Sequence, residues 1–175
     1  MIIPIKAAVL TASDRSSQGE REDRSGMLLR NLLEGLPADV VAYRVIPDDK
    51  DILAKSLIHL ADLLSCDVIL TTGGTGLAPR DLTPEATRMV IDQEIPGISQ
   101  AIREDALKKT PMAMLSRAIA GTRGRTLIIN LPGSPTAVQE AFEVIRPVLL
   151  HAVELMRGEV TDCRKPSLLS HSHSA

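Results

Sequence analysis

Short apolar runs alternate with stretches of helical periodicity along most of the chain. The apolar or β-branched runs end in polar turns, as buried strands do. They predict strands at residues 5–10, 40–46, 68–71 and 126–130. The helical pattern is clearest over residues 48–64, where apolar side chains fall at positions 53, 57, 60, 61 and 64. This spacing places them on one face of a helix.

Further helices are predicted at residues 26–36, 98–109 and 134–156. One more helix begins at Thr83 and Pro84, with Thr83 as the N-cap and Pro84 in the first helical position. Pro147 is expected to bend the last long helix, because proline cannot donate a helical hydrogen bond. From residue 158 onward the apolar pattern is lost, so residues 158–175 are expected to form a disordered tail.

This alternation of strands and helices, joined by short connections, predicts an α/β fold. The expected architecture is a three-layer sandwich whose mostly parallel sheet is covered by helices on both faces. The 175 residues suffice for one domain with a sizeable core. We assign that domain to residues 1–157, and the sequence contains no internal repeat.

Composition and charge narrow the possible functions. A net charge of −2 and an aromatic content of 1% argue against a broad electrostatic grip on nucleic acid or membrane, and against base-stacking surfaces. The N-terminus lacks the features of a signal peptide, and no apolar run approaches the roughly 20 residues that span a bilayer. The two cysteines form no CxxC pair, which fits a reducing compartment. A cytoplasmic protein is therefore expected.

Four polar clusters each follow a predicted strand. They occupy residues 11–14, 47–49, 73–81 and 130–134. In an open parallel sheet, ligands bind outside the carboxyl ends of the strands. We therefore expect the four clusters to converge on one edge of the sheet.

The strongest local signal is a glycine-rich turn at residues 71–76, followed by Arg80 and Asp81. Glycine lets the backbone approach a ligand closely, and successive N–H groups in such a turn can surround a phosphate. The turn is neither a Walker A loop nor a GxGxxG motif, because the residues that define those motifs are absent. It indicates a phosphate site or, alternatively, only a sharp connection between strand and helix.

Asp48 and Asp81 form the second candidate group. Both lie just past predicted strand ends, so they can face one cleft. Mg²⁺ is usually held by one or two carboxylates together with phosphate oxygens, which makes the pair a candidate magnesium site. The alternatives are that Asp48 is a helix N-cap, assisted by Asp51, and that Asp81 pairs with Arg80 or closes a turn.

Two further turns carry weaker signals. The turn at residues 130–134 can present backbone groups to a ligand, but Ser134 alone is better explained as a helix N-cap. Thr11, Ser13 and Asp14 can bind phosphate or cap a turn. The remaining metal or nucleophile candidates are interpreted as structural: His59 and His151 lack a second ligand at metal spacing, and Cys66 resembles a small buried hydrophobe.

Four segments together resemble the molybdopterin adenylyltransferases, the MogA and MoaB type that also forms the G domain of gephyrin. The matching segments are residues 71–76, 80–87, 111–117 and 127–134, and the resemblance runs from about Lys6 to Arg157. It implies a three-layer α/β fold and a homotrimer, sometimes a hexamer. It also implies that Mg²⁺-ATP and molybdopterin give adenylylated molybdopterin and pyrophosphate, and that a molybdenum-insertion enzyme uses the product as a transient partner.

The same resemblance implies roles for individual residues. It makes Asp48 and Asp81 the catalytic carboxylates that hold Mg²⁺, and it places Thr11, Ser13 and Asp14 on the nucleotide side. The family's pterin-side and phosphate-side contacts match the following residues: Gly73, Gly74, Thr75, Gly76, Ser116, Pro132, Gly133 and Ser134. This sequence departs from many relatives at Ala106, where they carry serine, and a weaker grip on the pterin is expected if that serine contacts it.

Other functions remain open at the level of sequence. A non-catalytic molybdopterin-binding scaffold or a MoaB-type paralogue would have the same fold, although both aspartates are retained here. Competence-damage-inducible proteins and the molybdate-insertion enzyme contain related domains in longer chains. A plain interaction module is the third class, and ATP turnover separates it from an enzyme.

Overall fold

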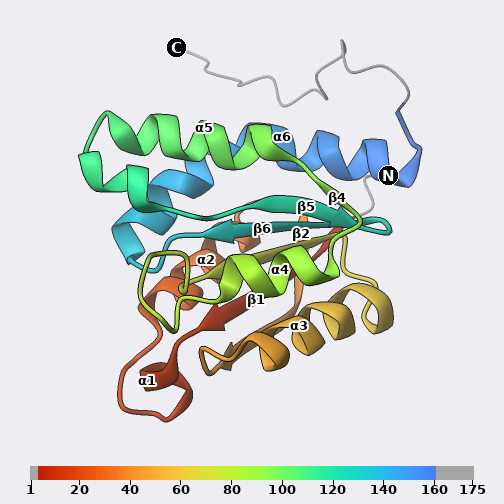
Figure 1. Ribbon diagram of the computed structural model, residues 1–175. Helices are drawn as coiled ribbons and strands as arrows, with labels where there is room; N and C mark the ends of the chain where they lie inside the picture. Colours follow the sequence, from red (N-terminus) through yellow and green to blue (C-terminus); the bar gives the residue numbers. More distant parts are fainter. Residues whose placement is uncertain (1–3, 161–175) are drawn as a thin grey trace.

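The computed structural model describes residues 4–160 and contains one six-stranded sheet with the strand order β2-β1-β3-β6-β5-β4 (Figure 1). The strands are β1 (Ile5–Ala12), β2 (Ala38–Ile46), β3 (Val68–Thr72), β4 (Gln93–Glu94), β5 (Ala120–Arg123) and β6 (Thr126–Leu131). The α-helices are α1 (Asp14–Ser17), α2 (Arg24–Glu34), α3 (Lys50–Ile58), α4 (Thr83–Val90), α5 (Pro96–Leu107) and α6 (Pro135–Arg157). A π-helical turn, η1 (His59–Leu63), continues α3, and a 3₁₀ helix, η2 (Pro111–Leu115), follows α5.

The sheet is mostly parallel, as the sequence predicts. Strands β2, β1, β3 and β6 run parallel, whereas β5 and β4 are antiparallel to their neighbours. The register pairs Thr11 with Thr72 and Thr72 with Leu131, so the carboxyl ends of three central strands lie level with one another. The four polar clusters therefore do converge on one edge of the sheet.

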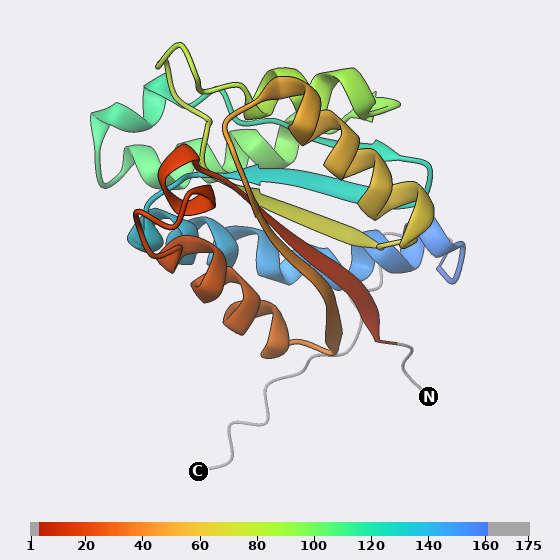
Figure 2. The ribbon, with the colours of Figure 1, turned by 90° about the horizontal axis from the view of Figure 1, so that it is seen from below.

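Helices cover both faces of the sheet, which confirms the three-layer sandwich (Figure 2). One face packs against α2, α5 and α6, and its core includes Leu29, Phe142 and Ile145. The other face packs against α3 and α4, with Leu53 and Leu57 in its core. Alternate residues of each central strand enter opposite cores, because successive side chains of a strand point to opposite faces.

Several segments differ from the sequence prediction. The short helix α1, the edge strands β4 and β5 and the 3₁₀ helix η2 were not predicted. The two residues of β4 are polar and exposed, and four residues of β5 are too few to show a period. The helix expected over residues 48–64 begins later and ends in the π-helical turn.

Two predicted helix caps are wrong. The N-cap of α3 is Asp49, not Asp48, and its carboxylate accepts hydrogen bonds from the backbone N–H groups of Asp51 and Ile52. Thr83 is not the cap of α4, because its hydroxyl donates to the carbonyl of Gly73 instead. The helices therefore begin within one residue of the predicted position, but their first turns are held differently.

The long helix α6 matches its prediction more closely. Ser134 caps it by accepting from the N–H of Ala137, and the helix continues through Pro147 to a left-handed Gly158. Most of the tail predicted at residues 158–175 lies outside the described residues. Within residues 4–160, no helix is long and apolar enough to cross a membrane.

Candidate active site

Three strands bring their following turns into close contact at Gly73. A β-carbon at Gly73 would collide with the carbonyl oxygen of Ala12, at the end of β1. A β-carbon at Gly133, after β6, would lie 3.3 Å from the α-carbon of Gly73. Gly73 and Gly74 also adopt positive φ angles of 90° and 65°, which other residues rarely tolerate. The glycines are thus required for β1, β3 and β6 to deliver their turns to one point.

Asp14 and Asp48 are locked together on one side of this point. The N–H of Asp14 donates to Oδ2 of Asp48 at 2.9 Å, and the N–H of Asp48 donates to Oδ1 of Asp14 at 3.1 Å. Arg80 closes the group with two hydrogen bonds to Asp14, of 2.5 and 2.8 Å. Arg80 therefore pairs with Asp14, and the predicted alternative of a pair with Asp81 is wrong.

Asp81 lies on the loop between β3 and α4, next to the same group. Its Oδ2 accepts from the N–H of Ala78 at 2.9 Å, so it does close a turn. The same oxygen lies 2.8 Å from the ideal β-carbon position of Gly76, and Oδ1 of Asp48 lies 3.3 Å from that of Gly74. Both carboxylates thus lie against the glycine loop.

These carboxylates suit a hard cation whose coordination is completed by substrate oxygens. In the described hydrogen bonds, Asp48 and Asp81 each accept through Oδ2 alone, which leaves Oδ1 for another partner. Within residues 4–160, no three acidic, His or Cys side chains form a group that could hold a metal ion. Two carboxylates with phosphate oxygens and water are the donor set that Mg²⁺ accepts.

The electrostatics of the two linked aspartates differ. Hydrogen bonds from Arg80 hold the pKa of Asp14 below its ordinary value. Burial raises the pKa of Asp48, and the negative charges of Asp14 and Asp81 raise it further against one backbone hydrogen bond. A cation placed between Asp48 and Asp81 would relieve this repulsion, since an opposite charge favours the ionised form.

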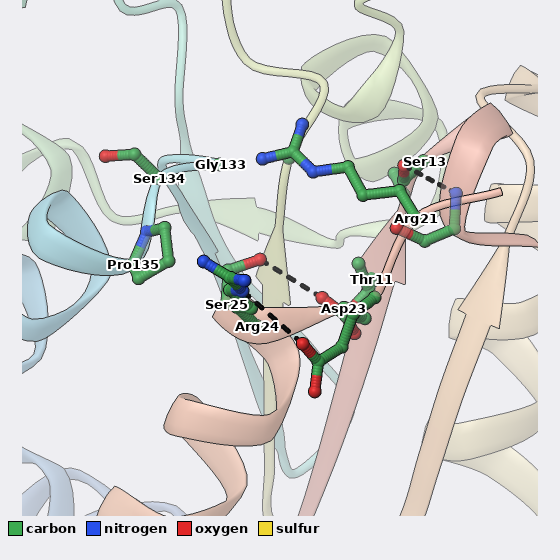
Figure 3. Close-up of a pocket in the computed structure, with 13 residues that line it drawn as sticks. Thr11, Ser13, Arg21, Asp23, Arg24, Ser25, Gly133, Ser134 and Pro135 are labelled. Atoms are coloured by element: carbon green, nitrogen blue, oxygen red, sulfur yellow. Dashed lines mark hydrogen bonds and ion pairs between the residues drawn. The ribbon is translucent and has the colours of Figure 1, made fainter. Parts of the chain in front are cut away.

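A polar cavity of about 350 Å³ opens on one side of the glycine loop (Figure 3). The turns after β1, β3 and β6 form part of its wall, which includes Thr11, Ser13, Gly73, Gly133 and Ser134. The loop before α2 and the start of α2 form the rest, with Arg21, Glu22, Asp23, Arg24 and Ser25. This second wall could not be predicted from the sequence, because no strand precedes it.

A second cavity, of about 300 Å³ and mainly apolar, is lined by later residues of the same loop. Its lining combines Thr75, Gly76, Ser116 and Pro132 with side chains of α5, η2 and α6. Ala106 is among the lining residues, so the position at which the sequence was expected to depart from its family faces this cavity. Apart from Ala106 and the family motif at residues 111–117, the lining residues of α5 and η2 were not predicted as site residues. The exposed Met112 of η2, for example, resembles an ordinary surface position.

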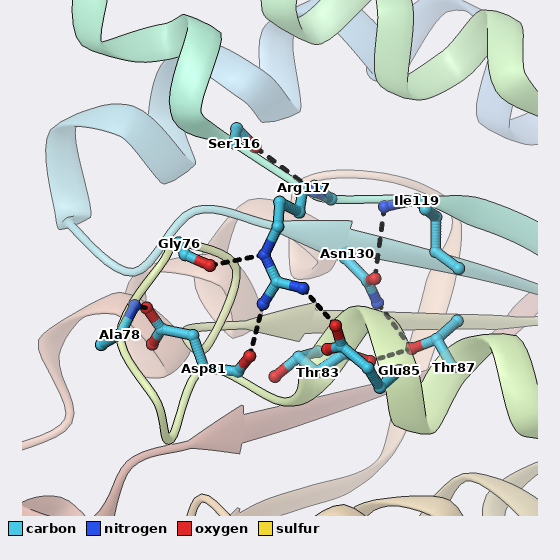
Figure 4. A network of polar contacts seen from close by, with 11 residues as sticks. Gly76, Ala78, Asp81, Thr83, Glu85, Thr87, Ser116, Arg117, Ile119 and Asn130 are labelled. Carbon is cyan, nitrogen blue, oxygen red and sulfur yellow. Dashed lines mark hydrogen bonds and ion pairs between the residues drawn. The ribbon is translucent and has the colours of Figure 1, made fainter.

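Arg117 holds the glycine loop in place through several contacts (Figure 4). Its guanidinium donates to the carbonyls of Gly76 and Asp81, at 2.7 and 2.5 Å, and forms an ion pair with Glu85. Its backbone N–H donates to the carbonyl of Thr75 at 2.9 Å. No role for Arg117 was predicted from the sequence beyond its place in a family motif.

Asn130 has a structural role beneath the site. It is fully buried, and its amide nitrogen donates to the hydroxyls of Thr71 and Thr87 at 3.0 and 2.9 Å. Its amide oxygen accepts from the N–H of Ile119 at 3.3 Å. These bonds join β6 to β3, α4 and the segment before β5, so Asn130 fixes the scaffold below the glycine turns.

The structure therefore gathers every residue predicted for the site along one edge of the sheet, in three places. Thr11, Ser13, Gly73, Gly133 and Ser134 line the polar cavity, whereas Thr75, Gly76, Ser116 and Pro132 line the apolar one. Asp14, Asp48, Gly74 and Asp81 lie around the loop between them. The buried hydroxyl of Thr11 has no hydrogen-bond partner among the described residues. Cys66 is buried as predicted, and burial raises the pKa of its thiol to about 11.

The comparisons with known proteins identify the family. The model of a probable molybdopterin-binding domain matches residues 8–151. The chain belongs to this family. A molybdopterin adenylyltransferase of Helicobacter pylori strain J99 is 42% identical over 156 residues, which cover 88% of this chain and 89% of the relative.

Two other similar proteins illustrate the range of the family. The molybdenum cofactor synthesis protein cinnamon of Drosophila melanogaster is 46% identical over 162 residues, covering 92% of this chain but 27% of that protein. The crystal structure of the molybdopterin biosynthesis enzyme MoaB from Thermus thermophilus has 50% sequence identity and a TM-score of 0.83. That match covers 88% of this chain and 97% of the other. The domain therefore occurs both as a chain of similar length and inside a longer protein.

Proposed function

We propose that this protein is a molybdopterin adenylyltransferase of molybdenum cofactor biosynthesis, which transfers AMP from Mg²⁺-ATP to the terminal phosphate of molybdopterin. The observation that supports this most directly is the pair of cavities that are both lined by residues of one glycine loop, with Asp48 and Asp81 beside that loop. A reaction between two substrates needs two adjoining sites and a means of neutralising phosphate charge between them. Membership of the family and the name of the Helicobacter pylori relative support the same activity.

The chemistry of the two cavities suggests which substrate each one holds. The polar cavity carries Arg21, Arg24 and the hydroxyls of Ser13 and Ser134, which suit the phosphates and ribose of a nucleotide. Its wall also contains Glu22, which pairs with Arg24 at 3.4 Å, and Asp23. The apolar cavity offers mainly apolar walls with Ser116 at its edge, which suit a pterin ring. The two reacting phosphates would then meet at the glycine loop.

Nucleotidyl transfer needs little covalent help from the protein, because the attacking phosphate is already an anion. Positioning of the two substrates and neutralisation of charge are the main contributions. Mg²⁺ would supply the charge neutralisation at the α-phosphate when bound. Asp48 and Asp81 would hold it, and the backbone N–H groups of the glycine loop would orient the phosphates.

The decisive experiment is incubation of the purified protein with molybdopterin, ATP and Mg²⁺, followed by mass analysis. The expected product is molybdopterin enlarged by one AMP, with one pyrophosphate released for each product formed. Omission of Mg²⁺ is the matched control. Binding of both substrates without any product would instead identify a non-catalytic scaffold.

We also propose a cellular location and an assembly for the protein. It would act in the cytoplasm as a homotrimer, or as a hexamer built from trimers, and pass its product to a molybdenum-insertion enzyme. Fusion of the same domain into longer proteins such as cinnamon fits a product that is handed on directly. Light scattering across micromolar concentrations tests the assembly, and a stable monomer would contradict it.

A further inference from the structure

Arg117 is placed to control the position of Asp81, although it lines neither cavity. In the loop at residues 76–82, the side chains of residues 77–80 are exposed. Within the loop, a single backbone hydrogen bond joins the N–H of Asp81 to the carbonyl of Ala78, at 2.9 Å. Such a segment has little regular structure of its own to hold it, so contacts from outside must define its shape.

The pair of Arg80 with Asp14 holds the middle of the loop, and the guanidinium of Arg117 provides contacts at both of its ends. It donates to the carbonyl of Gly76, where the loop begins, and to the carbonyl of Asp81, where it ends. A third branch pairs with Glu85 in the first turn of α4 (Figure 4). One planar group thus joins the entrance of the loop, its exit and the following helix.

Glu85 holds the guanidinium in this orientation. Its Oε2 atom is buried without a hydrogen-bond partner in the described part of the chain. The ion pair of its other oxygen with Arg117 compensates most of its charge, and Arg88 contributes less. The side chains of Arg117 and Glu85 are 35% and 37% exposed. The pair is therefore partly shielded from water, where a charge-assisted contact is stronger than on an open surface.

We propose that Arg117 is a positioning residue of the transferase, which sets the carboxylate of Asp81 at the distance from Asp48 that a divalent cation requires. This inference rests on the proposed function, because it assigns a purpose to the geometry of that site. The planar fork of arginine can reach three acceptors at once, whereas the ammonium of lysine is a point charge on a flexible stem. Lysine could still neutralise Glu85 but could not hold both carbonyls.

The test compares Arg117→Lys with Arg123→Lys. Arg123 is a matched control, because it also bridges a carboxylate, that of Asp62, and a backbone carbonyl, that of Val90. It lies on β5, and neither cavity at the glycine loop includes it. Both variants keep a positive charge, so both are expected to fold with similar melting temperatures.

Three measurements are made on the full-length proteins. Hydrogen–deuterium exchange of the amides of residues 76–82 reports the loop, and electron paramagnetic resonance of Mn²⁺ with ATP reports the cation site. AMP transfer reports the reaction. In Arg117→Lys we expect loop exchange to rise about tenfold, Mn²⁺ affinity to fall at least about threefold and transfer to fall at least about tenfold, since small misplacements of reacting groups are costly. In Arg123→Lys we expect all three to stay within about twofold, as for a substitution remote from a site.

Unchanged loop exchange and Mn²⁺ affinity in Arg117→Lys would overturn the inference, even if transfer fell. Equal effects in the two lysine variants would also overturn it, because they would indicate general loosening. If Arg117→Lys does not fold, the double variant Glu85→Gln with Arg117→Met removes the charge pair together and is measured in the same way. A wild-type protein that binds Mn²⁺-ATP but forms no product would refute the proposed function, while the exchange and Mn²⁺ measurements still decide the role of Arg117.

Discussion

Adjacent aspartates at the end of β2 offer the sharpest test of the site. Asp49 caps α3, whereas Asp48 faces the glycine loop. Substitution of Asp48 by asparagine should therefore abolish most AMP transfer without destabilising the protein, and loss of the Asp49 side chain should do the reverse. The two substitutions differ by one position in the sequence but act on different parts of the structure.

The structure indicates the stability effect of Asp48→Asn. An asparagine oxygen can still accept the hydrogen bond from the N–H of Asp14, which measures 2.9 Å. Burial and two neighbouring carboxylates raise the pKa of Asp48 in the folded protein. An aspartate with a raised pKa binds protons more tightly folded than unfolded, so its ionisation opposes folding once the pH exceeds its unfolded pKa. Asparagine lacks that cost, and the melting temperature at neutral pH should stay the same or rise.

The stability effect of Asp49→Ala follows from its two cap hydrogen bonds, of 3.0 and 2.9 Å. Loss of an N-cap costs about 0.5–2 kcal/mol, and about 1 kcal/mol lowers the melting temperature of a domain of this size by roughly 2–4 °C. Its effect on transfer should be less than about threefold, because cap loss acts on helix stability and not on the reacting groups. Asp49→Asn should be nearly neutral in both assays, since asparagine caps about as well as aspartate.

For Asp48→Asn, the transfer rate at saturating Mg²⁺ should fall at least about 100-fold, which corresponds to about 2.7 kcal/mol of transition-state stabilisation. Melting temperature and rate are measured on one preparation of each variant. A normal rate in Asp48→Asn would refute the reasoning and leave Asp81 as the sole carboxylate of the mechanism. A destabilised Asp48→Asn would show that its charge, and not only its acceptor, supports the fold.

Three further outcomes are expected. Asp81→Ala should remain folded but lose at least about 100-fold in transfer, and near-normal turnover in a folded variant would remove this residue from the mechanism. The acid limb of kcat/KM should lie at a higher pH than the ordinary aspartate range, because the pKa of Asp48 is raised and its carboxylate ionises only at higher pH. This limb should move to lower pH as the Mg²⁺ concentration is increased, and a limb that does not depend on Mg²⁺ would contradict this. Ala106→Ser should lower the KM for molybdopterin but leave the KM for ATP unchanged, because Ala106 lines only the apolar cavity; an altered KM for ATP would argue against the assignment of the cavities.

Most of the fold follows from the sequence because its signals are local. The central strands β1, β3 and β6 are nearly continuous apolar runs, as strands buried on both faces must be. Helical periodicity identified α2, α3, α5 and α6, and glycine-bearing turns marked where strands end. The convergence of the four polar clusters then followed from the parallel sheet alone.

The edge of the sheet and the helix caps could not be predicted in this way. Strand β4 forms only because β5 offers it hydrogen bonds across the chain, and its own two residues carry no pattern. A cap is decided by which carboxylate meets the free N–H groups. The sequence left open a cap at Asp48, and the structure places the cap one residue later, at Asp49. Thr83 is a residue type that often caps helices, but its hydroxyl donates to the nearby carbonyl of Gly73 instead.

The sequence by itself determined the layers, the edge that carries the site and the turn residues that follow the strands there. Only the tertiary structure decided how those residues divide between two cavities and which side chains hold them in place. Arg80 meets Asp14 across 66 positions, and Arg117 meets Gly76 across 41. The physical reason is that periodicity and turn chemistry act between near neighbours, whereas a charged side chain selects its partner among all groups that folding brings within reach.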